Sequence, residues 1–296
     1  MFPVFIIEGE NKKEAIPSMP GIYRYSLDLL LEEIAECQEL GIQIFAPFPS
    51  IPDGLKDEQA SQSWNEEGLY LRAIREIKGK FSQVCLVTDV AMDPYSSAGH
   101  DGLVEDGKIL NDETLEILAR MAVAQAEAGA DIVAPSDMMD GRVGYIRDEL
   151  DTAGFSEVSI LAYSAKYASA FYGPFRDALD SAPKFGDKKT YQMNPANVRE
   201  ALLEAELDYE EGADLMMVKP ALPYLDIIHL LKTHFEIPIA AYQVSGEYAM
   251  IKAAAQNGWL DGEQTMQESL MSIKRAGADI VLTYFAKEFA KLSVTQ

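Results

Sequence analysis

The chain has 296 residues and is strongly acidic, with Lys+Arg 25 against Asp+Glu 48 and a formal net charge of -23. Such a surface repels phosphate backbones and anionic membranes, so neither nucleic acid nor a membrane is an expected partner. The sequence shows no secretory leader and no apolar run of about 18 residues, and this predicts a cytoplasmic protein. The two cysteines, Cys37 and Cys85, form no CxxC pair, which argues against disulfides and a cysteine zinc site.

Short apolar runs recur along the chain and predict the strands of a parallel sheet. Three of them follow a Gly-Ala-Asp turn, at Gly129, Gly212 and Gly277, where glycine accepts the left-handed conformation that ends a helix. Strands that are apolar along their whole length are buried on both faces. The predicted strands, about eight in all, lie near residues 2–7, 43–48, 83–90, 132–137, 158–163, 215–220, 237–242 and 280–285.

Amphipathic helices are expected between these strands. Leu27 to Cys37 and Leu115 to Ala126 have helical spacing, Asn111 starts the second of these helices, and Asn194 starts another over 196–211. Such alternation favours a single (β/α)₈ barrel domain over 1–296, with an open doubly wound sheet as the alternative. Long polar loops at about 91–110 and 171–195 follow predicted strands and are expected to form lids on the C-terminal face.

The C-terminal strand ends are where barrel enzymes hold their active sites. A lysine at the end of an apolar strand is desolvated, and a neighbouring cation lowers its pKa further. Most lysines in a protein are surface residues, so either lysine alone would be weak evidence for a nucleophile. Lys166 and Lys219 stand at adjacent strand ends, so we predict two amine nucleophiles, each lowering the pKa of the other. The strand ends also carry Asp89, Ser136, Asp137, Ser245, Glu247 and Tyr284.

Longer motifs around these lysines resemble a known family. SAKYASAFYGPFRDA, YQMNPAN, MMVKPALPYLDI, YQVSGEYAMIKAA and SIKRAGADIVLTYFA are similar to segments of porphobilinogen synthase, also called 5-aminolevulinate dehydratase, over nearly the whole chain. The resemblance implies a hydro-lyase of tetrapyrrole (heme and chlorophyll) biosynthesis that condenses two molecules of 5-aminolevulinate to porphobilinogen with loss of two waters. Lys219 matches the lysine that forms a Schiff base with the propionate-side substrate, and Lys166 matches the acetate-side lysine.

The resemblance also implies how the substrate carboxylates are held. Arg176, Lys188 and Gln192 would bind the acetate-side carboxylate, and Ser245 and Tyr284 the propionate-side one. Arg and Lys form charge-assisted hydrogen bonds to carboxylates, which suits the assignment. The alternative for Arg176 and Lys188 is that they merely solubilise a loop. For Ser245 and Tyr284 it is that their hydroxyls merely satisfy backbone groups.

The metal-binding pattern departs from that of many family members, which carry three zinc-binding cysteines after the third strand. The corresponding positions here are Ala91, Asp93 and Asp101, so no active-site zinc is expected. The sequence resembles the aspartate-rich branch of the family, where Asp89, Asp93 and Asp101 would tune the amines and move protons. His100, a lone loop histidine, is expected to form hydrogen bonds and not to bind a metal.

Glu204, in REALLEAELDYEEGAD, matches a glutamate that binds an allosteric Mg²⁺ at a subunit interface, mostly through water. The alternative is an exposed carboxylate on an acidic helix. Family members form homo-octamers with an N-terminal arm that wraps a neighbouring subunit. Met1 stands directly before the first predicted strand, so this arm is expected to be missing and the size of the homo-oligomer stays open.

Two other functions remain compatible with a barrel. A class I aldolase also places a Schiff-base lysine at a strand end, but it needs only one. A non-catalytic barrel that binds a small acid has no need of two lysines near carboxylates. The pair of Lys166 and Lys219 therefore favours the dehydratase.

Overall fold

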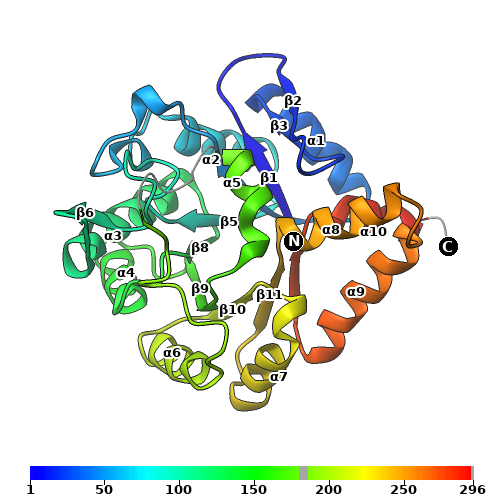
Figure 1. Cartoon of the computed structure of the whole chain (residues 1–296). Helices are drawn as coiled ribbons and strands as arrows, with labels where there is room; N and C mark the ends of the chain where they lie inside the picture. Colours follow the sequence, from blue (N-terminus) through cyan, green and yellow to red (C-terminus); the bar gives the residue numbers. More distant parts are fainter. Residues whose placement is uncertain (180–185, 295–296) are drawn as a thin grey trace.

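The barrel is closed by hydrogen bonds between its first and last strands. The computed structural model describes residues 1–179 and 186–294, and within them one sheet has the strand order β12-β11-β10-β9-β8-β5-β4-β1-β3-β2. Met1 N donates to Val281 O at 3.0 Å, and Thr283 N donates to Met1 O at 3.2 Å. These bonds join β1 to β12, so the predicted (β/α)₈ barrel is confirmed and the open sheet is excluded (Figure 1).

The barrel strands are parallel and lie close to the predicted segments. They are β1 (Phe2–Ile6), β4 (Ile44–Pro49), β5 (Cys85–Val90), β8 (Ile132–Pro135), β9 (Ser159–Lys166), β10 (Leu215–Lys219), β11 (Ile239–Gln243) and β12 (Ile280–Thr283). Two short hairpins, β2 (Lys13–Ala15) with β3 (Tyr23–Tyr25) and β6 (Leu103–Glu105) with β7 (Lys108–Leu110), are additions to the barrel.

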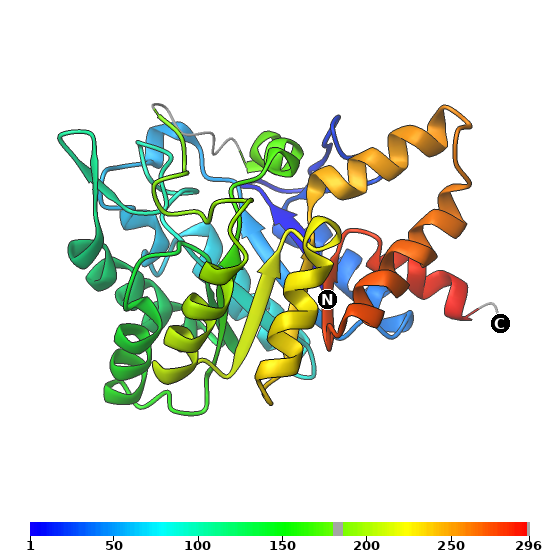
Figure 2. The same ribbon diagram turned by 60° about the horizontal axis from the view of Figure 1, so that its bottom comes forward.

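Helices surround the strands (Figure 1). They are α1 (Leu27–Glu39), α2 (Leu69–Lys80), α3 (Asn111–Ala128), α4 (Arg142–Thr152), α5 (Gly173–Leu179), α6 (Arg199–Glu210), α7 (Leu225–His234), α8 (Ser245–Gln256), α9 (Gly262–Ala276) and α10 (Ala286–Val294). Figure 2 shows α5 at one end of the barrel, whereas α8 and α9 project from its side. Among the described residues, no helix is long and apolar enough to cross a membrane.

The Gly-Ala-Asp turns connect helices to strands as predicted, and their aspartates have an additional role. The glycines have positive φ: Gly129 108°, Gly212 100° and Gly277 125°. Each aspartate carboxylate accepts the N–H of a residue in the neighbouring strand: Leu86 N binds Asp131, Ile160 N binds Asp214, both at 2.8 Å, and Ile239 N binds Asp279 at 2.9 Å. The repeated aspartate therefore ties the start of one strand to the strand beside it.

A β-bulge lies between β9 and β10, which change register between Met216 and Val218. Before it Met216 pairs with Ala162, and after it Val218 and Lys219 pair with Ala165 and Lys166, so β9 contains one extra residue. Strict alternation would turn Tyr163 and Lys166 to opposite faces. Both face the interior instead, since Lys219 Nζ lies 5.2 Å from the Tyr163 ring and shares a cavity with Lys166. The bulge turns Lys166 inward.

Some local predictions differ from the structure. Helix α6 begins at Arg199, later than the predicted 196, and Asn197 Oδ1 in the turn before it accepts the N–H of Arg199 at 3.1 Å. The side chain of Asn194 accepts the N–H of Ala196 at 2.9 Å in the preceding turn. The two hairpins were missed because three-residue strands are too short to show a period. Of the second expected lid, residues 180–185 lie outside the described residues.

Replacing Asp214 with alanine tests whether its hydrogen bond to the neighbouring strand stabilises the barrel. Asp214→Ala leaves the N–H of Ile160 without its carboxylate acceptor, so the free energy of unfolding should fall by about 1 kcal/mol. Urea unfolding followed by circular dichroism measures this change. The exposed Glu157 provides the control, and an equal loss in Glu157→Ala would contradict the role of Asp214.

Candidate active site

Lys166 and Lys219 lie side by side at the C-terminal end of the barrel. They are the last residues of β9 and β10 and are direct partners in the parallel register. Both are buried, with 5% and 8% of their surfaces exposed. They line a cavity of about 40 Å³ together with other residues that the sequence singled out, namely Asp93, Arg176, Lys188, Gln192, Ser245 and Tyr284. The predicted meeting of the two amines is confirmed.

The Lys219 amine is surrounded by aromatic rings. Its Nζ lies 4.7 Å from the centre of the Tyr242 ring and 5.2–5.3 Å from those of Tyr163, Tyr172 and Phe175. Burial, followed by the charge of Lys166, lowers the pKa of Lys219 to about 7. Rings attract an ammonium only weakly compared with the water that burial removes. Lys219 therefore holds a large fraction of neutral amine at neutral pH.

The Lys166 amine has oxygen atoms as neighbours. Its Nζ donates a hydrogen bond to the backbone carbonyl of Ser136, directly after β8, and it lies 3.9 Å from Asp101 Oδ2. Asp101 belongs to the loop that follows β5. The two lysines thus differ in their surroundings although they are adjacent in the sheet.

Asp93, Asp101 and Lys188 form a buried charge cluster across the two expected lids. Lys188 Nζ lies 3.1 Å from Asp93 Oδ2 and 3.0 Å from Asp101 Oδ2. Burial opposes ionisation of Asp101, but the charges of Lys166 and Lys188 outweigh it and lower its pKa to about 2. Burial raises the pKa of Asp93 despite Lys188. Loops 91–110 and 186–195 are therefore joined by ion pairs beside the amines.

Asp89 lies near the amines, close to the end of β5, and is half-buried. Burial and the charge of Asp93 raise its pKa to about 6, whereas a hydrogen bond from Ser136 and the charges of Lys219 and Lys166 act in the opposite direction. The carboxylates at this end of the barrel therefore titrate differently. This separation is typical of acid–base catalysis.

Ser245 and Tyr284 line the cavity, but their hydroxyls already have protein partners. Ser245 Oγ accepts the N–H of Phe175 at 2.9 Å and donates to Phe171 O at 3.4 Å. Tyr284 and Tyr242 share a hydrogen bond of 2.7 Å. Ser245 therefore anchors the segment that carries α5. A substrate carboxylate at Ser245 would compete with this segment.

Comparison with known proteins identifies the family. A family model described as delta-aminolevulinic acid dehydratase matches residues 1–292. The chain belongs to the delta-aminolevulinic acid dehydratase family. It is 58% identical to the chloroplastic enzyme of Oryza sativa subsp. japonica over 99% of this chain and 69% of that protein, and 56% identical to the enzyme of Bradyrhizobium diazoefficiens over 100% and 84%. The predicted lyase of tetrapyrrole biosynthesis is confirmed.

Solved structures agree with this family. The delta-aminolevulinic acid dehydratase of Toxoplasma gondii, in complex with its product porphobilinogen, is 54% identical, with a TM-score of 0.98 over 99% of this chain and 84% of that chain. An aldolase named QR15 reaches a TM-score of 0.51 at 12% identity over 99% of this chain and 94% of that chain. At that identity the likeness to the aldolase shows a shared fold alone.

The cytoplasmic prediction is wrong when set against these dehydratases. The relatives from rice, Physcomitrium patens and Pisum sativum, at 57–58% identity, are named chloroplastic. The prediction depended on the absence of a secretory leader. A barrel's composition does not report its compartment, which is set by separate targeting segments.

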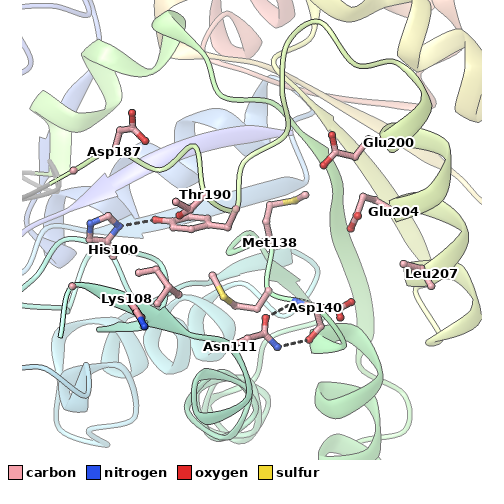
Figure 3. A pocket seen from close by; sticks show the side chains of 15 residues that line it. His100, Lys108, Asn111, Met138, Asp140, Asp187, Thr190, Glu200, Glu204 and Leu207 are labelled. Carbon is pink, nitrogen blue, oxygen red and sulfur yellow. Dashed lines mark hydrogen bonds between the residues drawn. The ribbon is translucent and has the colours of Figure 1, made fainter. Parts of the chain in front are cut away.

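Glu204 lies apart from the dehydratase cavity, on α6. It lines a larger cavity of about 1060 Å³ whose wall also includes Asp140, Glu200 and His100 (Figure 3). Burial raises the pKa of Glu204, although the charge of Arg142 opposes this. Within the described ranges no group of three or more His, Cys, Asp or Glu could hold a metal ion. His100 Nδ1 lies 3.1 Å from the Tyr191 hydroxyl and so forms the expected hydrogen bond.

The four rings around the Lys219 amine were not predicted. Tyr163 and Tyr242 were assigned only to apolar strands, although both stand near the C-terminal ends of their strands, and this position could have marked them. Tyr172 and Phe175 come from the segment after β9. Their inward orientation depends on how that segment folds back, and no local pattern reports this.

Replacing Gly246 with alanine tests whether the α5 segment must sit on α8. A Cβ at Gly246 would lie 2.5 Å from the backbone oxygen of Phe171, so the segment has to shift. Overpacking of this kind costs roughly 1–3 kcal/mol. Gly246→Ala should therefore raise KM for 5-aminolevulinate and also lower the melting temperature by several degrees. Gly79→Ala, where a Cβ meets nothing within 4 Å, is the control, and unchanged kinetics in Gly246→Ala would exclude the contact as important.

Proposed function

We propose that the cavity at Lys166 and Lys219 condenses two molecules of 5-aminolevulinate into porphobilinogen through two lysine Schiff bases. The observation that carries this proposal is the pairing of two buried amines in one cavity. A neutral amine attacks a ketone carbonyl, water leaves, and the resulting iminium activates the neighbouring carbons. Lys219, whose pKa is lowered to about 7, is suited to hold the propionate-side substrate, and Lys166 the acetate-side one.

In this proposal the remaining cavity residues bind the carboxylates of the two substrate molecules. Arg176, Lys188 and Gln192 hold the acetate-side carboxylate, and Ser245 and Tyr284 the propionate-side one. The observation in favour is that all five line the same cavity.

The aspartates have separate roles in the same proposal. Asp89, with its pKa raised to about 6, is the proton carrier, whereas Asp101, whose pKa is about 2, stays ionised and holds Lys166 and Lys188. Asp93 helps to position Lys188, whose Nζ lies 3.1 Å from Asp93 Oδ2. A carrier has to exchange its proton near neutral pH, and Asp89 is closer to this condition than Asp101.

The cavity size supports a lid role for the loops 91–110 and 171–195. A volume of about 40 Å³ holds a few water molecules and not two organic acids. The segment Gly173–Leu179, which contributes Phe175 and Arg176 to the wall, has to move to admit substrate. We therefore propose one catalytic unit over 1–296 with these loops as lids.

We also propose Mg²⁺ as an allosteric ligand at Glu204. Mg²⁺ commonly keeps several waters and binds only one or two carboxylates. Glu204 and Glu200 on one wall of the larger cavity, with Asp140 nearby, fit this chemistry, and the protomer offers no fuller set of ligands among its described residues. When bound, Mg²⁺ would neutralise these carboxylates. Leu203 and Tyr209, exposed on the same helix, suit a subunit contact in a homo-oligomer.

Borohydride trapping tests the Schiff bases. With 5-aminolevulinate, wild-type protein should carry substrate on both Lys166 and Lys219, and each lysine-to-methionine variant should keep only the other label. An aldolase would lose all trapping with one substitution. Peptide mass spectrometry locates the adducts, and the exposed Lys80→Met is the control. Absence of both porphobilinogen and adducts in folded wild type would refute the function.

The pH dependence of trapping tests the electrostatics of Lys219. The neutral amine is the nucleophile, so the trapping rate at Lys219 should rise as the pH increases through about 7. Replacing Lys166 with methionine removes a positive charge, which raises the pKa of Lys219 and moves the profile to higher pH. A profile that stays in place would contradict a coupling between the amines.

Mg²⁺ binding is tested at Glu204. Glu204→Gln removes one negative charge from the larger cavity, so calorimetric titration with MgCl₂ should show a binding constant reduced by about tenfold or more, because a charge contact of 1.4 kcal/mol corresponds to tenfold. Glu206→Gln, on the exposed face of the same helix, is the matched control. Equal binding by wild type and Glu204→Gln would exclude Glu204 as a ligand.

A further inference from the structure

Glu247 is a buried carboxylate that none of the roles above includes. It is the third residue of α8 and has 0% of its surface exposed. Its two oxygens accept three backbone N–H groups: Val244 at 2.7 Å, Leu222 at 2.7 Å and Ala221 at 3.3 Å. Burial raises its pKa to about 7, whereas these three donors oppose the rise. Such a carboxylate is expensive to bury, so its position requires a reason.

Helix capping explains only one of the three bonds. A glutamate or glutamine at the third helical position commonly accepts the N–H of the residue before the helix, here Val244. Either side chain serves that purpose, since one oxygen is enough. The bonds from Ala221 and Leu222 come from a different loop, 25–26 residues earlier in the chain. They require both oxygens of an ionised carboxylate as acceptors.

The two loops that Glu247 joins are those of the propionate-side substrate. Ala221 and Leu222 follow Lys219 and Pro220, and because proline has no N–H, they are the first backbone donors after the lysine. Val244 directly precedes Ser245. One end of this loop pair thus carries the amine that takes the ketone, and the other carries the hydroxyl assigned to the carboxylate of the same molecule.

We propose that Glu247 is a positioning residue that sets the distance between the Lys219 amine and the Ser245 hydroxyl, and so selects an oxo acid by its chain length. The inference rests on the proposed function of Lys219 and Ser245. In 5-aminolevulinate two methylene groups separate the carboxylate from the ketone. A fixed span between amine and hydroxyl favours that spacing over a longer one. Glu247 touches no substrate atom in this role and acts through the two loops.

The test uses Glu247→Gln, which keeps the shape of the side chain but replaces one accepting oxygen by an NH₂ group. That group faces backbone N–H donors, so the tie to Ala221 and Leu222 breaks or shifts. Glu33→Gln is the matched control, because Glu33 is a buried carboxylate bonded to Tyr25 and Lys287, neither of which lines the catalytic cavity.

Trapping with two oxo acids measures the span. Each protein is reduced with borohydride in the presence of levulinate, which is 5-aminolevulinate without its amino group, or of 5-oxohexanoate, which is one methylene longer. Wild type and Glu33→Gln should label Lys219 with levulinate in preference to 5-oxohexanoate. In Glu247→Gln the levulinate label at Lys219 should fall by about tenfold, the effect of losing a hydrogen bond to a charged group, and the preference should disappear. Labelling of Lys166 should not change.

Each other outcome has a distinct meaning. A folded Glu247→Gln with wild-type labelling and preference overturns the role of Glu247. An equal fall at both lysines also overturns it, because the effect is then a general loss of structure. If wild type itself is not labelled at Lys219, the proposed function fails whatever Glu247 does. Should Glu247→Gln not fold, Glu247→Asp keeps the charge without the reach and should show the same change in preference, and an unchanged preference would overturn the proposal.

Discussion

The pairing of Lys166 with Lys219 depends on the bulge in β9. In a sheet with strict alternation, a shift of one residue turns every later side chain to the other face. Tyr163 and Lys166 could then not both face the interior of the barrel. The extra residue of β9 between Ala162 and Ala165 brings Lys166 back inward, opposite Lys219. Without it, one amine would point toward the outer helices and the cavity would hold a single nucleophile.

The two adjacent amines of Lys166 and Lys219 differ in the chemical nature of their neighbours. Lys219 is held among rings that provide no hydrogen-bond acceptor along their faces, so burial dominates and favours its neutral form. Lys166 is held by the Ser136 carbonyl and the ionised Asp101. The sequence predicted that desolvation and mutual repulsion together would activate both amines. The structure ranks burial above repulsion for Lys219, because its aromatic neighbours remove water on several sides.

The sequence was sufficient for the barrel and for the residues on its strand ends, and insufficient where a contact joins distant segments. Fully apolar runs and Gly-Ala-Asp turns are local signals, and they placed the strands and Lys219 correctly. Phe175 reaches the cavity only because α5 folds over the barrel. The start of α6 was misplaced because the side chains of Asn194 and Asn197 both accept a nearby backbone N–H. The bulge itself has no local signature, since every residue of β9 that follows Ser159 is buried.

In the proposed function, Ser245, Gly246 and Glu247 connect substrate binding to movement of the lid. The Ser245 hydroxyl has one proton; it donates to Phe171 O and accepts from Phe175 N. In the proposed function, a substrate carboxylate at Ser245 would accept the hydrogen bond that the hydroxyl now donates to Phe171 O, which releases a bond holding the α5 segment. Gly246 allows the backbone of Phe171 to approach closely, while Glu247 keeps Val244 fixed to the Lys219 loop. If Ser245 and Glu247 act as proposed, the hydroxyl exchanges a lid contact for a substrate contact without any change in its distance from the amine.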